Sequence, residues 1–163
     1  LADVGDWEGY AKHPLYYEQF LAYVSEGDAL FGHRSIKSCD LQHESLWLLD
    51  EGHCFRDQLV KFCSLKSAGA SRRAYTLGSI ETFMRMVEAG QGITFIPELA
   101  LDQLTSSQKE LVRPFAIPIP TREIVMLTTK TFIRQGIKQM VIDEIRRSVP
   151  QRMLKMNNTE QRV

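Results

Sequence analysis

The chain has 163 residues, 44% hydrophobic and 25% charged, and its 20 basic and 20 acidic side chains cancel. This balance predicts a globular protein with a sizeable core and excludes an overall field that attracts nucleic acid. Three cysteines are too few, and odd in number, for the disulfide framework of a secreted domain. The cysteine count thus favours a reducing cytoplasm, and because no apolar run approaches the roughly 20 residues of a membrane span, we expect no membrane partner.

Strands dominate the expected elements at the start of the chain. Residues 1–4 read as the end of a buried strand without an initiator methionine or a signal peptide, so we expect a piece of a longer protein. Residues 15–25 are rich in Tyr, Phe, Leu and Val and predict a strand pair or one long bent strand. The apolar run 46–49 predicts a short buried strand, which the turn at residues 51–52 ends.

A helix with a cysteine near each end is predicted next. The apolar residues fall at helical spacing, which places Cys54 at the mouth of the helix and Cys63 near its far end (Phe55, Leu59, Val60, Phe62, Cys63). Nine helical steps span roughly 13 Å and about 900° of rotation, so the two sulfurs point to opposite faces. A disulfide requires Cα atoms within about 7 Å. A bond between these cysteines therefore requires the helix to unwind, which is the logic of a redox switch.

The two thiols of this helix differ in their expected surroundings. Cys54 faces the free N–H groups and positive dipole end, which favour a thiolate. His53 and Arg56 add positive charge, whereas nearby carboxylates oppose it (Asp50, Glu51, Asp57). Cys63 lies on the apolar stripe and is expected to be buried and inert while reduced. The alternative to a redox switch is that both cysteines are ordinary core residues. Cys54-x-x-Asp57 would then serve only as a capping box at the start of the helix.

A strand at 73–77 and a second helix are expected after a small-residue linker. Ser79 is a suitable N-cap, one face of the helix is apolar, and Gly90 ends it. Residues 93–96 then predict a buried strand, and Pro97 opens a short helix through Leu101.

Two strands and a helix complete the expected elements. Residues 111–117 and 124–129 predict the strands, and residues 137–149 predict an amphipathic helix with four residues inward (Met140, Val141, Ile142, Ile145). The alternation of strands and helices predicts an α/β fold with a largely parallel sheet.

Two stretches resemble LysR-type transcriptional regulators. Residues 51–63 (EGHCFRDQLVKFC) are similar to the segment with which some members of that family sense peroxide. Residues 79–97 (SIETFMRMVEAGQGITFIP) are similar to the helix–turn–strand element common to effector domains of the family. The first motif is specific to the peroxide sensors and the second to the broader family. The resemblance runs from about Pro14 to Ile145.

The resemblance implies a two-lobed, periplasmic-binding-protein-like effector domain whose chain crosses between lobes near residues 15–17 and 121–124. Lobe II comprises residues 17–122 and is complete in this sequence. It contains a redox-switch segment at residues 53–67. Lobe I is partial and takes residues 1–16 and 123–163. The winged helix-turn-helix that binds DNA in the family is absent from this sequence.

The same resemblance implies a chemistry for the cysteines. Hydrogen peroxide oxidises Cys54 to sulfenic acid, and Cys63 resolves it to a Cys54–Cys63 disulfide. His53 and Arg122 support the thiolate and the leaving oxygen, and Asp57 is a further site residue. We expect no cofactor and no metal site in this chain.

The resemblance also implies partners. The regulatory domains assemble as a homodimer or tetramer, the missing N-terminal domain binds DNA, and the switch controls transcription of oxidative-stress genes. A glutaredoxin with glutathione, or a thioredoxin system, reduces the disulfide again.

Other interpretations of these residues stay open. The cysteine pair is also that expected of a thiol peroxidase, or incidental in an effector domain that binds a small molecule. Cys39 and His43, with His53 and Cys54, suggest zinc ligands, although their spacing matches no closed zinc pattern. Ser79 at a helix N-terminus suggests an anion site as well as a plain N-cap.

Overall fold

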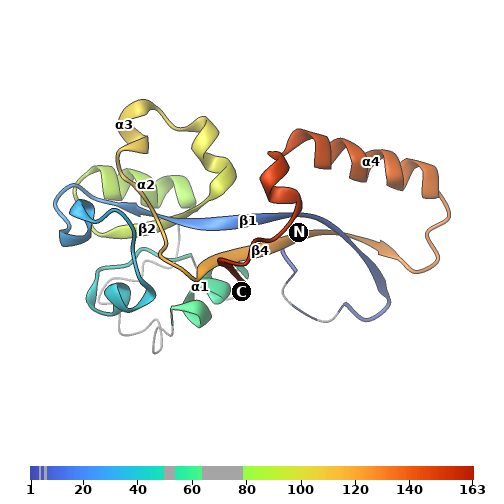
Figure 1. Ribbon diagram of the computed structural model, residues 1–163, viewed down its shortest axis with the longest axis horizontal. Coiled ribbons are helices and arrows are strands. Elements are labelled where there is room, and N and C mark those ends of the chain that lie inside the picture. The colour runs from blue at the N-terminus through green and yellow to red at the C-terminus, as the bar shows by residue number, and fades with distance from the viewer. Residues whose placement is uncertain (4, 6, 50–53, 64–78) are drawn as a thin grey trace.

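The computed structural model describes residues 1–3, 5, 7–49, 54–63 and 79–163. Two long strands, β1 (Tyr10–Val24) and β4 (Ile119–Thr129), lie side by side through the middle of the molecule (Figure 1). Helix α4 (Gln135–Ser148) lies at one end of this pair, and the other described α-helices cluster at the opposite end. β1 therefore connects the two ends of the molecule.

The helices at the second end are α1 (Cys54–Phe62), α2 (Ile80–Glu88) and the single turn α3 (Ser106–Lys109). The remaining described elements are short strands and 3-10 helices: η1 (Ala29–Gly32), η2 (Ser38–His43), β2 (Ile93–Pro97), η3 (Glu98–Gln103), β3 (Val112–Pro114), η4 (Gln151–Leu154) and β5 (Glu160–Arg162). In the part of the chain that the structure describes, no helix has the length and apolar character needed to cross a bilayer.

The described strands follow the order β2-β1-β4-β5, with β3 also paired to β1. β1 is antiparallel to β2, β3 and β4, and only the β4–β5 pair of these strands is parallel. The expectation of a largely parallel sheet is therefore wrong. Alternation of helices and strands implies parallel neighbours only when consecutive strands pair, and β1 instead pairs with strands far along the chain.

The two faces of β1 bury two different clusters because successive side chains of a strand point to opposite sides. Phe20, Ala22 and Val24 pack in the cluster around α1, with Leu59, Phe95 and Phe115. Leu21 and Tyr23 pack in the cluster around α2, with Trp47, Phe83 and Ile96. The alternating apolar residues of this strand thus position both helices.

Several strand boundaries differ from the expected ones. β1 begins at Tyr10 rather than residue 15, and its register shifts between Pro14 and Tyr16, where the strand accommodates the proline. β4 includes residues 119–123, expected as a connection, and β3 is shorter than residues 111–117. The run 46–49 makes a single parallel bridge, Leu46 with Ile93. Near the N-terminus, Ala2 bridges Ile124, and the expected strand 73–77 lies outside the described residues.

The three predicted long helices are confirmed as α1, α2 and α4, while the expected helix after Pro97 is the 3-10 helix η3. The inward face assigned to α4 is partly wrong. Ile142 is buried, but Met140 and Val141 are 71% and 42% exposed. At 100° per residue, Met140 lies about 200° from Ile142, so the two cannot share one buried face.

Candidate functional site

Helix α1 begins at Cys54 and is held against the sheet by apolar side chains. Phe55, Leu59 and Cys63 are buried in the cluster around α1, and the Phe55 ring meets the Phe20 ring edge-on, 4.8 Å between centroids. Phe62 makes a similar contact with Phe115, at 5.9 Å. The helical hydrogen bonds continue past the last helical residue, since Cys63 N–H donates to the Leu59 carbonyl at 2.9 Å.

The two cysteines of this segment are both free thiols with unequal exposure. Cys54 is partly exposed at the N-terminal end of α1, and Cys63 is buried at the other end. Burial raises the pKa of the Cys63 thiol to about 12. Because only a thiolate is a good nucleophile, burial disfavours the reactive form of Cys63. The expected burial of Cys63 is therefore confirmed, and the different chemical roles of the two thiols stay a prediction.

Arg122 lies next to the start of α1 but is paired with a carboxylate. Its Nε and Nη2 atoms donate to the Glu18 Oε2 atom at 2.9 and 2.7 Å, across directly opposed positions of β1 and β4. The guanidinium carbon lies 5.2 Å from the Phe55 ring centroid and 5.6 Å from that of Phe20. Arg122 thus contacts the residue that follows Cys54.

Glu18 is a site residue that the sequence analysis missed. Its side chain is almost fully buried, and besides Arg122 it accepts a hydrogen bond from the Leu99 N–H at 3.2 Å. A buried carboxylate requires such partners. The available signal was one acidic residue inside an apolar strand sequence, residues 15–24.

Of the other predicted site residues, Asp57 is not brought into this arrangement. The Asp57 side chain is 56% exposed and contacts the Arg56 Nη1 atom at 3.4 Å, so it faces solvent. His53 lies outside the described residues. Cys39 is exposed, and the described residues contain no group of three or more His, Cys, Asp or Glu side chains arranged to hold a metal ion.

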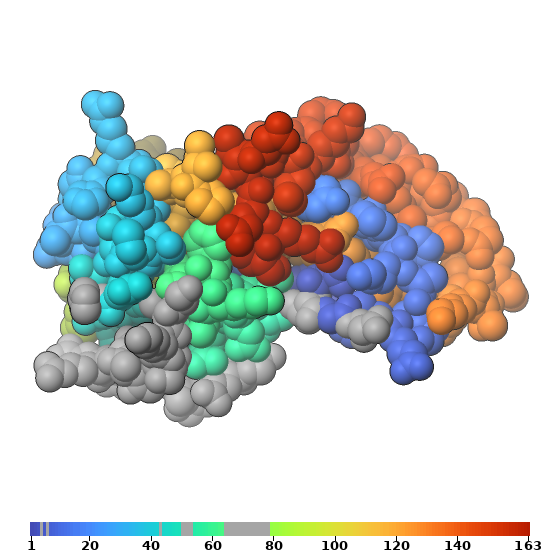
Figure 2. All heavy atoms as spheres, turned by 60° about the horizontal axis from the view of Figure 1, so that its bottom comes forward, coloured from blue at the N-terminus to red at the C-terminus, as the bar shows by residue number. Residues whose placement is uncertain are grey.

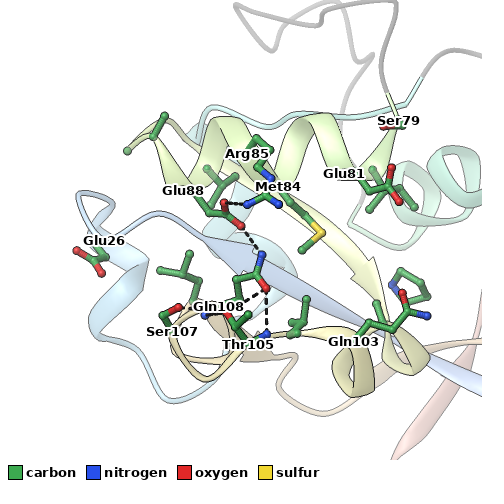
Figure 3. A pocket seen from close by; sticks show the side chains of 18 of the residues that line it. Glu26, Ser79, Glu81, Met84, Arg85, Glu88, Gln103, Thr105, Ser107 and Gln108 are labelled. Carbon is green, nitrogen blue, oxygen red and sulfur yellow. Dashed lines mark hydrogen bonds and ion pairs between the residues drawn. The ribbon is translucent and has the colours of Figure 1, made fainter.

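An open cleft lies elsewhere, between α2, η3 and α3 (Figure 3). Its polar side chains bond to one another: Gln108 Nε2 donates to Glu88 Oε1 at 2.8 Å, and Arg85 Nη1 to Glu88 Oε2 at 2.7 Å. Ser79 at its rim accepts a hydrogen bond from the Thr82 N–H at 3.2 Å, which confirms its role as N-cap of α2. Neither Cys54 nor Arg122 lines this cleft.

The turn after α2 shows why the sequence carries two glycines there. Gly90 and Gly92 have φ angles of +86° and +65°. A Cβ atom on Gly92 would collide with the Ser45 carbonyl oxygen and lie 2.9 Å from Trp47 Nε1. These glycines end the helix and turn the chain into β2, as expected.

Residues 1–148 match the family described as LysR substrate binding domain. The chain belongs to this family. The α/β, periplasmic-binding-protein-like fold class expected from the sequence is confirmed with it. Where the chain divides into two lobes, near residues 17 and 122, stays a prediction.

Relatives of the chain are named as transcription regulators. The hydrogen peroxide-inducible genes activator of Dickeya chrysanthemi is 30% identical over 158 residues, 96% of this chain and 51% of the relative. The DNA-binding transcriptional dual regulator OxyR of Escherichia coli K12 is 34% identical over 125 residues, 76% of this chain and 40% of the relative. The chain thus spans about half or less of the length of these relatives.

Solved structures of OxyR share the fold. The structure of reduced OxyR from Porphyromonas gingivalis superimposes with a TM-score of 0.90 at 45% identity, covering 99% of this chain and 74% of that one. The reduced OxyR regulatory domain from Pseudomonas aeruginosa gives 0.76 at 30% identity, covering 90% and 70%. The resemblance stated from residues 51–63 and 79–97 is therefore confirmed.

Proposed function

We propose that this chain is the peroxide-sensing regulatory part of a LysR-type transcription activator. The observation that carries the proposal is α1, with partly exposed Cys54 at its first residue and buried Cys63 just past its end. Its support is the 45% identity to an OxyR structure over nearly the whole chain. The two free thiols, kept apart by an intact helix, are the reduced state of a switch.

The first chemical step takes place at Cys54. Its thiolate attacks one oxygen of hydrogen peroxide, the O–O bond breaks, and the other oxygen leaves as hydroxide, which takes a proton to become water. The sulfur loses two electrons and becomes a sulfenic acid. Cys54 stands at the positive N-terminal end of α1, and Arg122, in contact with Phe55, adds near the leaving hydroxide a positive charge that Glu18 partly offsets.

The second step forms the disulfide and remodels the segment. The Cys63 thiolate attacks the sulfenic sulfur, a Cys54–Cys63 bond forms and hydroxide leaves. Since the pKa of buried Cys63 is about 12, this thiol ionises readily only after the helix opens and water reaches it. Unwinding therefore comes before the second step, and it exposes Phe55 and Leu59 at a cost of roughly 1.5–3 kcal/mol each.

The oxidised form recovers that cost only if the released apolar side chains find new partners. A rearranged homodimer or tetramer interface between regulatory domains provides such partners. A DNA-binding domain outside this chain would report the change, and a thiol reductant such as a glutaredoxin or thioredoxin would reset it.

Mass spectrometry of the intact protein tests this function. After stoichiometric peroxide, the Cys63→Ser variant should gain one oxygen atom and react with a sulfenic-acid reagent, whereas wild type should lose two hydrogen atoms. Cys54→Ser should show neither product, and Cys39→Ser should behave like wild type. Equal labelling of Cys39 and Cys54 would contradict the assignment, and sustained peroxide consumption with a thiol donor would favour a peroxidase instead.

A further inference from the structure

The last residues of the chain lie across α1 and β4. β5 pairs in parallel with the start of β4, Thr121 opposite Arg162, and the Val163 N–H donates to the Thr121 carbonyl at 3.1 Å. Figure 2 shows this C-terminal segment, in red, directly against the green residues of α1. The end of the chain therefore touches both the helix and the strand that carries Arg122.

Gln58 is the residue of α1 that meets this segment. It lies one helical turn after Cys54 and is only 5% exposed, and its Nε2 atom donates to the Val163 carbonyl oxygen at 2.9 Å. Among the described residues the Gln58 Oε1 atom accepts no hydrogen bond. A buried amide costs free energy unless it is bonded, so the bond to Val163 is what keeps this polar side chain in an apolar environment.

The C-terminal segment is fixed on its other side as well. The Val163 side chain packs against the cluster that contains Phe55, Leu59 and Cys63. Arg162 pairs through Nη1 with Glu123 Oε2 at 2.7 Å, and through Nη2 with Asp3. Because these partners belong to β4 and to the N-terminal segment, the Val163 carbonyl cannot follow α1 when the helix moves.

We propose that Gln58 and the C-terminal residue Val163 form a strap that holds α1 helical, and that release of this strap controls how fast Cys63 captures oxidised Cys54. The proposal rests on the peroxide-sensing function proposed above. Gln58 is a positioning residue in it, because it acts through the helix and not on the peroxide. The strap leaves the first oxidation step unchanged and slows the second.

The geometry explains why the bond to Val163 must break. Cys54 and Cys63 are nine residues apart, so their Cα atoms come within about 7 Å only when the intervening turns unwind. Gln58 lies between the two cysteines, in the stretch that must change conformation. Its side chain is tied to a carbonyl that stays with β4, and the hydrogen bond is lost when the helix opens.

Rapid mixing with peroxide separates the two steps by following sulfenic acid and disulfide over time. Deletion of Val163 removes the acceptor and should speed disulfide formation about 3- to 10-fold, the size expected of one buried hydrogen bond, with sulfenic acid formation unchanged. Val163→Ala keeps the backbone carbonyl and loses apolar contact alone, so it should change the rate less than about twofold. In a Gln58→Met background, deletion of Val163 should bring less than about twofold further acceleration, because the shared contact is already gone.

Two results would overturn the strap: deletion and Val163→Ala giving equal rates, or the full acceleration persisting in Gln58→Met. Hydrogen exchange on the reduced protein tests the strap without any peroxide chemistry. Deletion of Val163 should increase exchange of the α1 amides about 3- to 10-fold, and unchanged exchange would rule the strap out. If no variant forms sulfenic acid while exchange rises as expected, the proposed function fails together with the control of disulfide formation, and only the stabilisation of α1 by the strap stands.

Discussion

Two regions of this molecule are built with opposite kinds of contact. The β1–β4 pair carries a buried ion pair between Glu18 and Arg122, which are in register across the strands, and the half-exposed Lys12 of β1 pairs with the buried carboxylate of Asp3 at 2.8 Å. Helix α1, in contrast, is held by apolar packing and by the hydrogen bond from Gln58 to Val163. Breaking a buried ion pair leaves an uncompensated charge, whereas apolar contacts are given up in small steps. We therefore expect the β1–β4 pair to keep its conformation on oxidation and α1 to change its conformation.

The largest expected effect is on the stability contributed by the β1–β4 pair. Glu18→Ala leaves the Arg122 guanidinium buried without its carboxylate and should lower the free energy of unfolding by about 3–5 kcal/mol. Glu144→Ala is the matched control, because Glu144 pairs with Arg147 at 3.2 Å on the exposed side of α4 and should cost less than about 1 kcal/mol. Urea unfolding of the reduced proteins measures both. Equal losses of unfolding free energy in the two variants would show that the buried Glu18–Arg122 pair stabilises the protein no more than the exposed Glu144–Arg147 pair.

A second expectation concerns the pH dependence of stability contributed by α1. The folded pKa of Cys63 is raised by burial to about 12 from the ordinary 9.0, so between these values the folded state keeps a proton that the unfolded chain loses. This contribution is fully present below pH 9 and decreases as pH rises towards 12. Reduced wild type should therefore lose stability above pH 9 more steeply than Cys63→Ala. Parallel pH profiles of the two proteins would show that Cys63 is not buried in solution.

A smaller effect is expected where the two regions meet. Replacing Arg122 with Met removes the positive charge beside the start of α1 and should slow oxidation of Cys54 about tenfold, or about 1.4 kcal/mol in the activation barrier. This variant also leaves Glu18 unpaired, so the double variant Glu18→Gln, Arg122→Met is the control. It should recover much of the stability but none of the rate. A wild-type rate in the double variant would exclude Arg122 from the reaction.

What the sequence predicted well is local. The α1 and α2 helices, the N-cap Ser79 and the burial of Cys63 follow from spacing within about ten residues, where helical periodicity operates. The motif in residues 51–63 is likewise local, and it indicates the family that residues 1–148 match.

What the sequence did not predict depends on pairing across the chain. The bond between Arg122 and Glu18 joins residues 104 positions apart, and Gln58 meets Val163 over 105 positions. No local pattern encodes these pairs, nor the antiparallel neighbours of β1. The exposed Met140 is a different kind of error, because helical periodicity already excludes one buried face that holds both Met140 and Ile142.

The most direct test of the account is hydrogen exchange of the reduced and the oxidised protein, read across Phe55 to Phe62. In the reduced form these amides should be protected, because they belong to an intact helix packed on the sheet. Once the disulfide has formed, protection there should collapse, while β1 and β4 keep theirs. Persistent protection in a protein whose mass and peptide map show a Cys54–Cys63 bond would contradict the central claim that α1 must unwind.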